Sequence, residues 1–439
     1  MRIIASSDRN EIATLLARSV SRDPDVDATA AAIVKDVREG GDRALKDWMA
    51  KLDGVKGRFE VTRKELRAGW AATPRVVRDA IRLSVHHIRR VAERQLPRPF
   101  VLEVRRGLKI EQRVQPLARV GCYVPGGRHP LPSTLLMTAV PARVAGVKEI
   151  IVACPNPAPA VLCAAVEAGA TSVLRIGGAQ AIAALAYGTE SIEPVNKIVG
   201  PGNAWVAAAK SLVSADCPID FHAGPSEIVI VSDRGKPEWI AADLIAQAEH
   251  DPRARAIFIT TRRTLADQVA SAVEEQTPKQ GPAAEALRDY GAIVVVKTRK
   301  GAIDLANRLA PEHLVCESAR DVPKFTAAGT IFVGEWSAQA AGDYSTGSNH
   351  VLPTGGAAKF RGGLSAADFV RVFTVQTLSR KGFAAIASSV VALAEAEGLD
   401  AHADSIRVRW EAIKSGGRSA APSGGRSAAR GGRRASSGD

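Results

Sequence analysis

Four short polar stretches place a histidine beside acids or amides, in a chain that is otherwise 46% hydrophobic. They contain His250, His313, His350 and His402. Neutral imidazoles next to carboxylates are the groups from which metal sites and proton-transfer sites are built. Because apolar, fold-forming sequence separates the four stretches, they predict one active site assembled from distant parts of the second half of the chain.

Gln247 and His250 are three residues apart, near the end of a predicted helix. That spacing puts both side chains on one helix face about a turn apart, which suits two ligands of one metal ion. The alternative is a histidine that only stabilises the C-terminal end of the helix through the helix dipole.

Glu312 and His313 directly precede an apolar stretch that is typical of a strand. Open α/β sheets build catalytic crevices at strand ends, so one residue could take a hydroxyl proton while the other activates water. A pair on a surface loop is the alternative interpretation.

Asp343 and His350 lie in a loop with two glycines, and Glu397 and His402 lie where two predicted helices meet. A loop carboxylate is a plausible hard ligand for a divalent ion, and His350 could bind substrate. Acids and histidines also occur at helix ends without a function. Together with Gln247 and His250, however, these residues supply the nitrogen and oxygen donors of a zinc site with room for substrate.

Short β-branched stretches alternate with Ala-rich helical ones, which is the pattern of parallel sheets with crossover helices. The expected strands are 119–124, 149–154, 171–176, 196–200, 227–232, 256–261, 292–296, 314–317 and 330–333. We predict an α/β fold with two Rossmann-like parallel-sheet domains, incomplete because no Gly-x-Gly-x-x-Gly follows a strand, plus helical N- and C-terminal segments. Residues 1 to about 110, and about 366 to 410, are expected to be mostly helical.

Two glycine turns follow expected strands and open helices: Gly177-Gly178-Ala-Gln180 and Gly200-Pro-Gly202-Asn203. Such turns let the backbone approach an anionic ligand at a helix N-terminus. They are equally typical of ordinary loops.

The composition narrows the class of protein further. Five widely spaced cysteines form no Cys-x-x-Cys pair, and no apolar stretch has the length of a signal or membrane-spanning segment, so we expect a cytoplasmic protein without a membrane partner. The net charge of +13 and an Arg-rich tail, 415–439, raise nucleic-acid binding as an alternative. The tail lacks the aromatics that base stacking needs, so no nucleic acid is expected, and its composition predicts disorder.

Long motifs in order resemble the histidinol dehydrogenase family, from about residue 10 to 414. They are Tyr-Val-Pro-Gly-Gly (123–127), Gly-Gly-Ala-Gln-Ala-Ile-Ala-Ala-Leu-Ala-Tyr-Gly-Thr-Glu (177–190), Gly-Pro-Gly-Asn (200–203), Ala-Gly-Pro-Ser-Glu (223–227), Gln-Ala-Glu-His (247–250), Pro-Glu-His-Leu (311–314) and Gly-Asp-Tyr-Ser-Thr-Gly-Ser-Asn-His-Val-Leu-Pro-Thr (342–354).

The resemblance implies oxidation of L-histidinol to L-histidine through the aldehyde, the last step of histidine biosynthesis, with NAD and one zinc ion per subunit. It implies His313 as the base for the alcohol proton and Glu312 as the residue that activates water. The implied zinc ligands are Gln247, His250, Asp343 and His402. The implied NAD contacts are Tyr123, Gln180 and Asn203. The implied substrate contacts are Ser226, Gln247, His250, His313, Asp343, His350, Glu397 and His402.

The resemblance also implies a homodimer whose C-terminal segment reaches the partner's site, so that Glu397 and His402 act in trans. The resemblance also implies that Gln339 occupies a position where several family members have Glu and others do not. A neutral amide holds a cationic substrate less strongly than a carboxylate does, so this residue bears on substrate affinity more than on the class of reaction. The alternative within the family is a related zinc/NAD dehydrogenase for another small polar alcohol, such as dihydroxypropanesulfonate, and the alternative outside it is a zinc hydrolase that needs no NAD.

The expected domain organisation rests on the pattern of strands and helices and on the family resemblance. It comprises an N-terminal helical segment (1–25), a metal and catalytic α/β domain (26–122 and 227–362), an NAD-binding α/β domain (123–226), a C-terminal helical dimerisation segment (363–414) and the basic tail (415–439).

Overall fold

The computed structural model describes residues 1–17, 23–126, 130–222 and 224–415. These residues form two compact units. The first unit comprises Met1–Pro97 and Gln115–Arg371, and the second comprises Arg98–Val114 and the chain from Val372 onward. Apart from Ser415, the tail for which we expect disorder lies outside the described residues.

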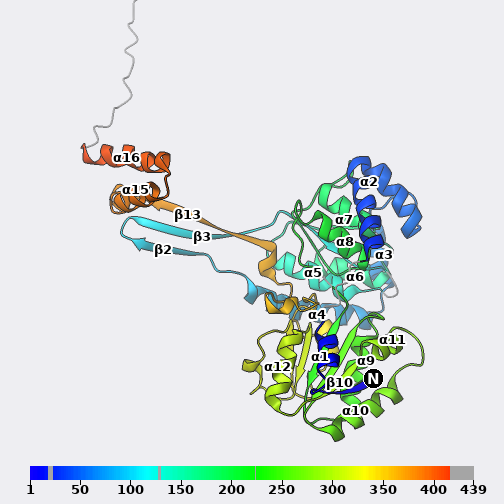
Figure 1. Ribbon diagram of the computed structural model, residues 1–439. Coiled ribbons are helices and arrows are strands. Elements are labelled where there is room, and N and C mark those ends of the chain that lie inside the picture. The colour runs from blue at the N-terminus through cyan, green and yellow to red at the C-terminus, as the bar shows by residue number, and fades with distance from the viewer. Residues whose placement is uncertain (18–22, 127–129, 223, 416–439) are drawn as a thin grey trace, which may run out of the picture. The chain divides into compact units, whose positions relative to one another are not determined.

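A six-stranded parallel sheet organises one half of the first unit (Figure 1). Its strand order is β1 (Arg2–Ala5), β10 (Ala292–Val295), β9 (Arg255–Thr260), β8 (Glu227–Val231), β11 (His313–Cys316) and β12 (Thr330–Val333). Side chains alternate between its faces, as in any strand. Ile228 and Ile230 pack with α9 (Pro237–Ala248), α10 (Arg263–Gln276) and α11 (Pro282–Asp289), whereas Val229 and Val231 pack with α1 (Arg9–Leu16) and α12 (Arg299–Leu309).

A four-stranded parallel sheet organises the other half of the first unit, in the order β6 (Ser172–Leu174), β5 (Glu149–Ala153), β4 (Arg119–Tyr123) and β7 (Lys197–Val199). One face packs with α4 (Arg75–Gln95), α5 (Pro132–Val144) and α6 (Pro159–Ala168). The other packs with α2 (Pro24–Trp48), α7 (Gly178–Tyr187) and α8 (Ala204–Val213). Both faces are covered, which explains why these strands are continuous apolar stretches.

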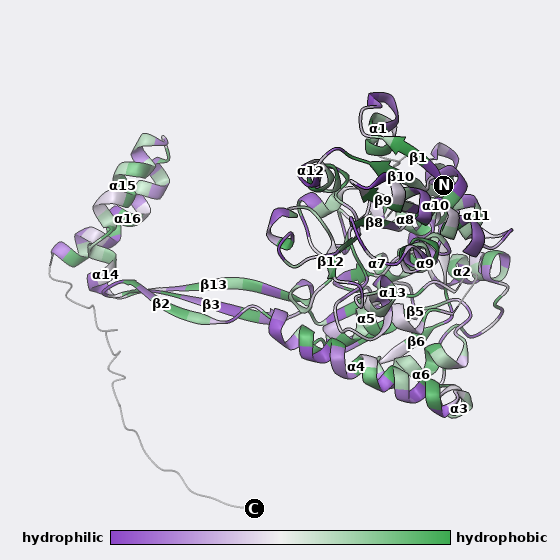
Figure 2. Ribbon diagram, turned by 90° about the horizontal axis from the view of Figure 1, so that it is seen from below, coloured by the Kyte–Doolittle hydropathy of each residue, from purple (hydrophilic) through white to green (hydrophobic). Residues whose placement is uncertain are grey.

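The second unit is built on an antiparallel hairpin of β2 (Phe100–Arg105) and β3 (Leu108–Pro116), to which β13 (Val370–Leu378) adds on the β3 side. The turn uses Gly107 at φ +84°, a conformation that favours glycine. Helices α14 (Arg380–Ala384), α15 (Ala387–Ala396) and α16 (Asp400–Lys414) follow. Both hydrophilic and hydrophobic residues colour these strands and helices in Figure 2.

The predicted mixed α/β fold with two parallel sheets is confirmed, and each expected strand corresponds to a strand of these sheets within one to three residues at its ends. Both ends of the chain are mostly helical, as expected, but each also contains strands that were not predicted. Strand β1 and the β2–β3 hairpin lie in the N-terminal stretch, and β13 lies in the C-terminal one. Between β11 and β12 the connection is only a 3-10 turn at Val322–Lys324.

Residues 26–122, which the sequence groups with 227–362, contain helices that pack elsewhere. Helix α2 packs on α7 and α8, and α3 (Arg63–Ala72) packs on α6, all beside the four-stranded sheet. The apolar residues of these amphipathic helices are buried there, and β4 completes that sheet from the same stretch. The domain boundaries themselves remain predictions. Within the described ranges, no helix is both long and apolar enough to cross a membrane.

Candidate active site

All predicted site residues except Glu397 and His402 lie in the first unit. Glu397 ends α15 and His402 lies in the first turn of α16, and both side chains are exposed.

His313 and Glu312 are buried where β11 begins, at the amino edge of the six-stranded sheet. The His313 Nδ1 atom lies 3.2 Å from the backbone oxygen of Glu227. Because a carbonyl can only accept, Nδ1 carries the proton, and in the neutral ring Nε2 is left as a base. Glu312 is held by the neighbouring strand too, since its Oε2 accepts a 2.9 Å hydrogen bond from the backbone N–H of Glu227.

The charges around His313 shift its protonation. Burial by itself lowers the pKa of His313, but the nearby carboxylates of Glu312 and Asp343 outweigh this effect and raise the pKa above its usual range. Burial also raises the pKa of Glu312 to about 7. A buried acid whose pKa lies near neutrality, next to an imidazole whose pKa is raised, is suited to exchanging protons with a bound molecule.

Asp343 lies on the short helix α13 (Gln339–Tyr344), with its Oδ1 atom 3.7 Å from His313 Nε2. Its Oδ2 atom accepts a 2.7 Å hydrogen bond from the Gln339 amide, which is itself buried. Burial would raise the pKa of Asp343, but the His313 imidazole and the charges of His350 and His250 hold it below its usual range. Asp343 is therefore an anion among three imidazoles.

His350 is fixed on both sides of its ring. Nδ1 donates to the backbone oxygen of Asp343 at 2.8 Å, and Nε2 lies 3.5 Å from the hydroxyl of Thr134 on α5. Burial lowers the pKa of His350 and favours its neutral form. His87 of α4 is half-buried, and its Nδ1 atom lies 2.6 Å from the backbone oxygen of Ser345 in the same loop.

Gln247 ends α9 almost fully buried, and its carbonyl oxygen Oε1 has no hydrogen-bond partner within the described residues. An orphaned buried acceptor is expected to have an unseen partner, and a cation is one candidate. His250 follows in the turn after α9 and interacts electrostatically with Asp343 and His350. In the described ranges, no cluster of three His, Cys, Asp or Glu side chains is close enough to hold a metal ion. The first unit supplies an amide, an imidazole and a carboxylate, a donor set that fits zinc with a fourth ligand from elsewhere.

The predicted NAD contacts gather at the carboxyl edge of the four-stranded sheet. Tyr123 ends β4, Gln180 lies in the first turn of α7 after β6, and Asn203 is the N-cap of α8 after β7. The order of the strands reverses between β4 and β7. Such a reversal is where open parallel sheets bind ligands.

Each of these residues also makes a contact that orients it. The Tyr123 hydroxyl accepts a 3.1 Å hydrogen bond from the backbone N–H of Gly178, and burial raises its pKa, so it keeps a proton to donate. The Asn203 Oδ1 atom accepts a 3.1 Å hydrogen bond from the backbone N–H of Val206, which leaves its amide hydrogens free to reach a ligand.

A buried ion pair fixes the turn that precedes Asn203. Lys210 and Asp220 are paired and almost fully buried. Lys210 donates to the backbone oxygen of Gly200 at 2.8 Å, and Asp220 accepts from the backbone N–H of Gly200 at 2.8 Å. Gly200 has φ +114°, and a Cβ there would lie 2.1 Å from the Tyr123 backbone oxygen, so only glycine fits.

Sequence reasoning missed other residues that build the site. The backbone of Glu227 hydrogen-bonds both Glu312 and His313, and its own buried carboxylate lies 3.6 Å from Arg255. Its place directly after Ser226, in a motif already noted, was a signal that could have pointed to it. Ser226 is half-buried at the entry to β8. Asp53 holds Gln180, and no feature of the sequence marked it.

The fold and the site are those of an α/β enzyme with a buried Glu–His pair whose chemistry suits proton transfer, and with a second parallel sheet whose strand order reverses. A sequence profile of histidinol dehydrogenase matches residues 16–410. The chain belongs to the histidinol dehydrogenase family and is an oxidoreductase, which confirms the resemblance of its motifs.

Individual relatives agree with this assignment. A histidinol dehydrogenase from Methanothermobacter thermautotrophicus is 45% identical over 92% of this chain and 98% of its own length. One from Rhizobium meliloti is 44% identical over 92% of this chain and 96% of its own. The crystal structure of histidinol dehydrogenase from Elizabethkingia anophelis superposes with a TM-score of 0.90 at 33% identity, covering 94% of this chain and 99% of that one.

Proposed function

We propose that this enzyme oxidises L-histidinol to L-histidine through L-histidinaldehyde, with NAD as the hydride acceptor, as the last step of histidine biosynthesis. The observation that carries the proposal is the buried Glu312–His313 pair beside Asp343, in a chain that aligns over nearly its whole length with histidinol dehydrogenases. The proposal includes a cytoplasmic location, supported by five free, buried cysteines, which suit a reducing compartment.

The hydrogen bonds of His313 and the raised pKa of Glu312 support a separate role for each residue. His313 takes the hydroxyl proton of the alcohol at Nε2, because Nδ1 is engaged by the Glu227 carbonyl. Glu312 takes a proton from the water that adds to the aldehyde, and its raised pKa allows it to hold that proton near neutral pH. Ser226, His350 and Glu397 contact the substrate in this proposal, and the neutral His350 can accept or donate a hydrogen bond.

The residues that would hold the metal are Gln247, His250, Asp343 and His402, with one zinc ion per subunit. The orphaned Gln247 oxygen and the anionic Asp343 support this assignment. When bound, the ion would orient the polar groups of the substrate. Tyr123, Gln180 and Asn203 would hold NAD, whose nicotinamide supplies the chemistry of hydride transfer.

The proposal includes a homodimer in which the second unit of one copy supplies Glu397 and His402 to its partner. Strand β2 supports it, because four of its six side chains are apolar and exposed: Phe100 by 48%, Val101 by 68%, Leu102 by 52% and Val104 by 59%. An exposed apolar strand of this kind is typical of a surface covered by another chain.

The reaction is tested by following NAD reduction with L-histidinol, with and without a chelator. We expect two NADH per histidine formed, and loss of turnover when the metal is removed. Activity on another alcohol but none on histidinol would instead favour the related dehydrogenase, an alternative supported by the neutral Gln339 beside Asp343. Turnover without NAD would favour a hydrolase.

The dimer is tested by mixing two inactive variants, His313→Ala and His402→Ala. If His402 acts in trans, a mixed dimer has one site with both residues intact, and random exchange restores about a quarter of the sites. If both residues act within one chain, mixing restores nothing.

A further inference from the structure

The proposed nucleotide site contains a buried polar atom without a partner. Gln180 is fully buried, and its carbonyl oxygen Oε1 accepts no hydrogen bond from the described residues. This oxygen lies over Gly178, where a Cβ would be only 2.6 Å away, so the glycine leaves the space that it occupies. A buried acceptor held in one place without a donor indicates that a ligand supplies the donor.

Asp53 determines which end of the Gln180 amide is free. Its Oδ2 atom accepts a 3.0 Å hydrogen bond from Gln180 Nε2 and a 3.2 Å hydrogen bond from the backbone N–H of Gly177. Because an ionised carboxylate can only accept, it selects the NH2 end of the amide and turns the carbonyl oxygen away from itself.

The position of Asp53 suits this role. It is the last residue of a π-helical turn, Met49–Asp53, that continues α2, and Met49 and Leu45 anchor that segment in the core. Gly177, the N-cap of α7, has no side chain to cap the helix, so Asp53 supplies the cap from a distant part of the chain. A structural cap alone would need only the bond to Gly177. The second hydrogen bond, from Gln180 to Asp53, indicates that Asp53 also has a role in ligand binding.

We propose that Asp53 is a positioning residue for NAD: it fixes the Gln180 amide so that the carbonyl oxygen faces a hydrogen-bond donor of the bound nucleotide. This inference rests on the proposed function, since it assumes that the carboxyl edge of the four-stranded sheet binds NAD. Asp53 contributes to affinity through Gln180 and does not itself contact the nucleotide.

The test measures the NAD+ dissociation constant of the full-length, zinc-loaded protein by calorimetry. Asp53→Ala frees the amide to rotate, and we expect affinity to fall about tenfold. Asp53→Asn keeps an oxygen acceptor at the same position, and we expect it to recover most of that loss. The KM for histidinol should change much less than the KM for NAD+ in both variants, which a general loss of structure would not produce.

A double-mutant cycle separates positioning from capping. In a Gln180→Met background the amide is absent, so adding Asp53→Ala should weaken NAD+ binding no further. Thr298→Ala is the matched control, because Thr298 caps α12 by accepting a 3.0 Å hydrogen bond from the Gly301 N–H, away from the nucleotide residues. It should lower the melting temperature as Asp53→Ala does, with NAD+ affinity unchanged.

The outcomes distinguish this inference from the function on which it rests. If the unmodified enzyme does not bind NAD+, the proposed function fails. If it binds NAD+ and Asp53→Ala binds equally well, or if Asp53→Ala weakens binding as much in the Gln180→Met background, the positioning role is overturned while the function stands.

Discussion

The two parallel sheets of the first unit share one topology but use opposite edges. Apart from the edge strand β1, the chain in each sheet winds outward from a central strand and then returns to the other side of that strand, so the strand order reverses between β4 and β7 in one sheet and between β8 and β11 in the other. The four-stranded sheet presents its predicted NAD contacts at the carboxyl edge of that reversal. The six-stranded sheet buries the proposed catalytic pair, Glu312 and His313, at its amino edge instead.

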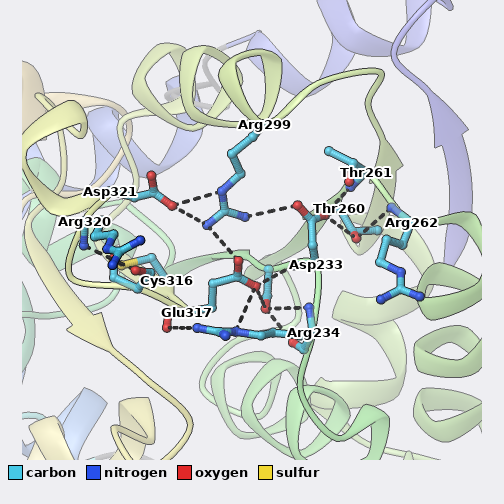
Figure 3. Close-up of polar contacts among 12 residues, drawn as sticks. Asp233, Arg234, Thr260, Thr261, Arg262, Arg299, Cys316, Glu317, Arg320 and Asp321 are labelled. Carbon is cyan, nitrogen blue, oxygen red and sulfur yellow. Dashed lines mark hydrogen bonds and ion pairs between the residues drawn. The ribbon is translucent and has the colours of Figure 1, made fainter.

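The difference lies in what fills the carboxyl edge of the six-stranded sheet. There the Glu317 carboxylate occupies the reversal, accepting 2.7 Å hydrogen bonds from the Asp233 N–H and the Ser232 hydroxyl (Figure 3). Arg299 joins three carboxylates, lying 2.8 Å from Asp321, 3.6 Å from Glu317 and 3.7 Å from Asp233. Charged side chains of the chain itself thus neutralise one another at this edge, and the buried Arg299 Nη1 atom, which has no hydrogen-bond partner within the described residues, lies 3.7 Å from the Asp233 carboxylate. At the four-stranded sheet, the atom without a partner is the uncharged Gln180 carbonyl oxygen. Both sheets therefore have the strand reversal at which open parallel sheets bind ligands, but the side chains at the two reversals differ.

The largest effect is expected at the amino edge. His313→Ala removes the base, and we expect kcat to fall about a thousandfold while NAD+ affinity remains unchanged. Steady-state kinetics and calorimetry on the same preparation measure both. If His313→Ala also lowered NAD+ affinity about a thousandfold, the amino edge of the six-stranded sheet and the carboxyl edge of the four-stranded sheet would have to act as one binding site.

Lys210→Met tests the carboxyl edge of the four-stranded sheet. It leaves the buried Asp220 charge unpaired and releases the Gly200 carbonyl, so we expect the free energy of unfolding to fall by about 3 kcal/mol. NAD+ affinity should fall as well, because Gly200 positions the turn before Asn203. Chemical denaturation and NAD+ titration are the measurements, and stability lost without any loss of affinity would contradict the proposed use of this edge.

Arg299→Ala is the corresponding change in the six-stranded sheet. It removes the cation shared by three carboxylates, and because Arg299 is partly exposed we expect a loss on the order of 2 kcal/mol in unfolding free energy. NAD+ affinity should not change. Arg320→Ala, an exposed neighbour, is the control that should cost little. Reduced NAD+ affinity in Arg299→Ala would mean that this edge also serves the nucleotide.

Local patterns predicted the parallel sheets, and they also marked Glu312 and His313 as a candidate pair. Continuous apolar strands between Ala-rich helices are a short-range signal, and Glu312 and His313 are adjacent in the chain. Strand β13 carried a signal too, since the β-branched residues Val370, Val372 and Thr374 recur at every second position, as in a strand. The helical sequence on either side concealed this signal. Strand β1 is only four residues long and pairs with β10, far along the chain.

Contacts between distant residues could not be predicted in this way. Asp53 and Gln180 are separated by 127 positions, and neither the π-helical turn nor its aspartate has a pattern that indicates the partner. Lys210 stands in an Ala-rich helix, where a lysine would ordinarily be exposed, and only the fold shows that it is buried against Asp220. Such residues are determined by packing, which a single sequence does not reveal.

The smallest expected effects separate two helix caps that look alike. Asn203 caps α8 and Thr298 caps α12, each accepting one backbone hydrogen bond at the carboxyl edge of its sheet. Replacing either by Ala should cost about 1 kcal/mol of unfolding free energy. Only the Asn203 variant should also weaken NAD+ binding.

Asn203→Ser sharpens this difference, because serine retains an oxygen that can cap the helix but lacks the amide hydrogens. We expect its melting temperature to match that of the unmodified enzyme and its KM for NAD+ to rise severalfold. If Asn203→Ser binds NAD+ normally while Asn203→Ala does not, the cap alone carries the effect. The four-stranded sheet would then differ from the six-stranded one in the open acceptor of Gln180 and the hydroxyl of Tyr123, and not in Asn203.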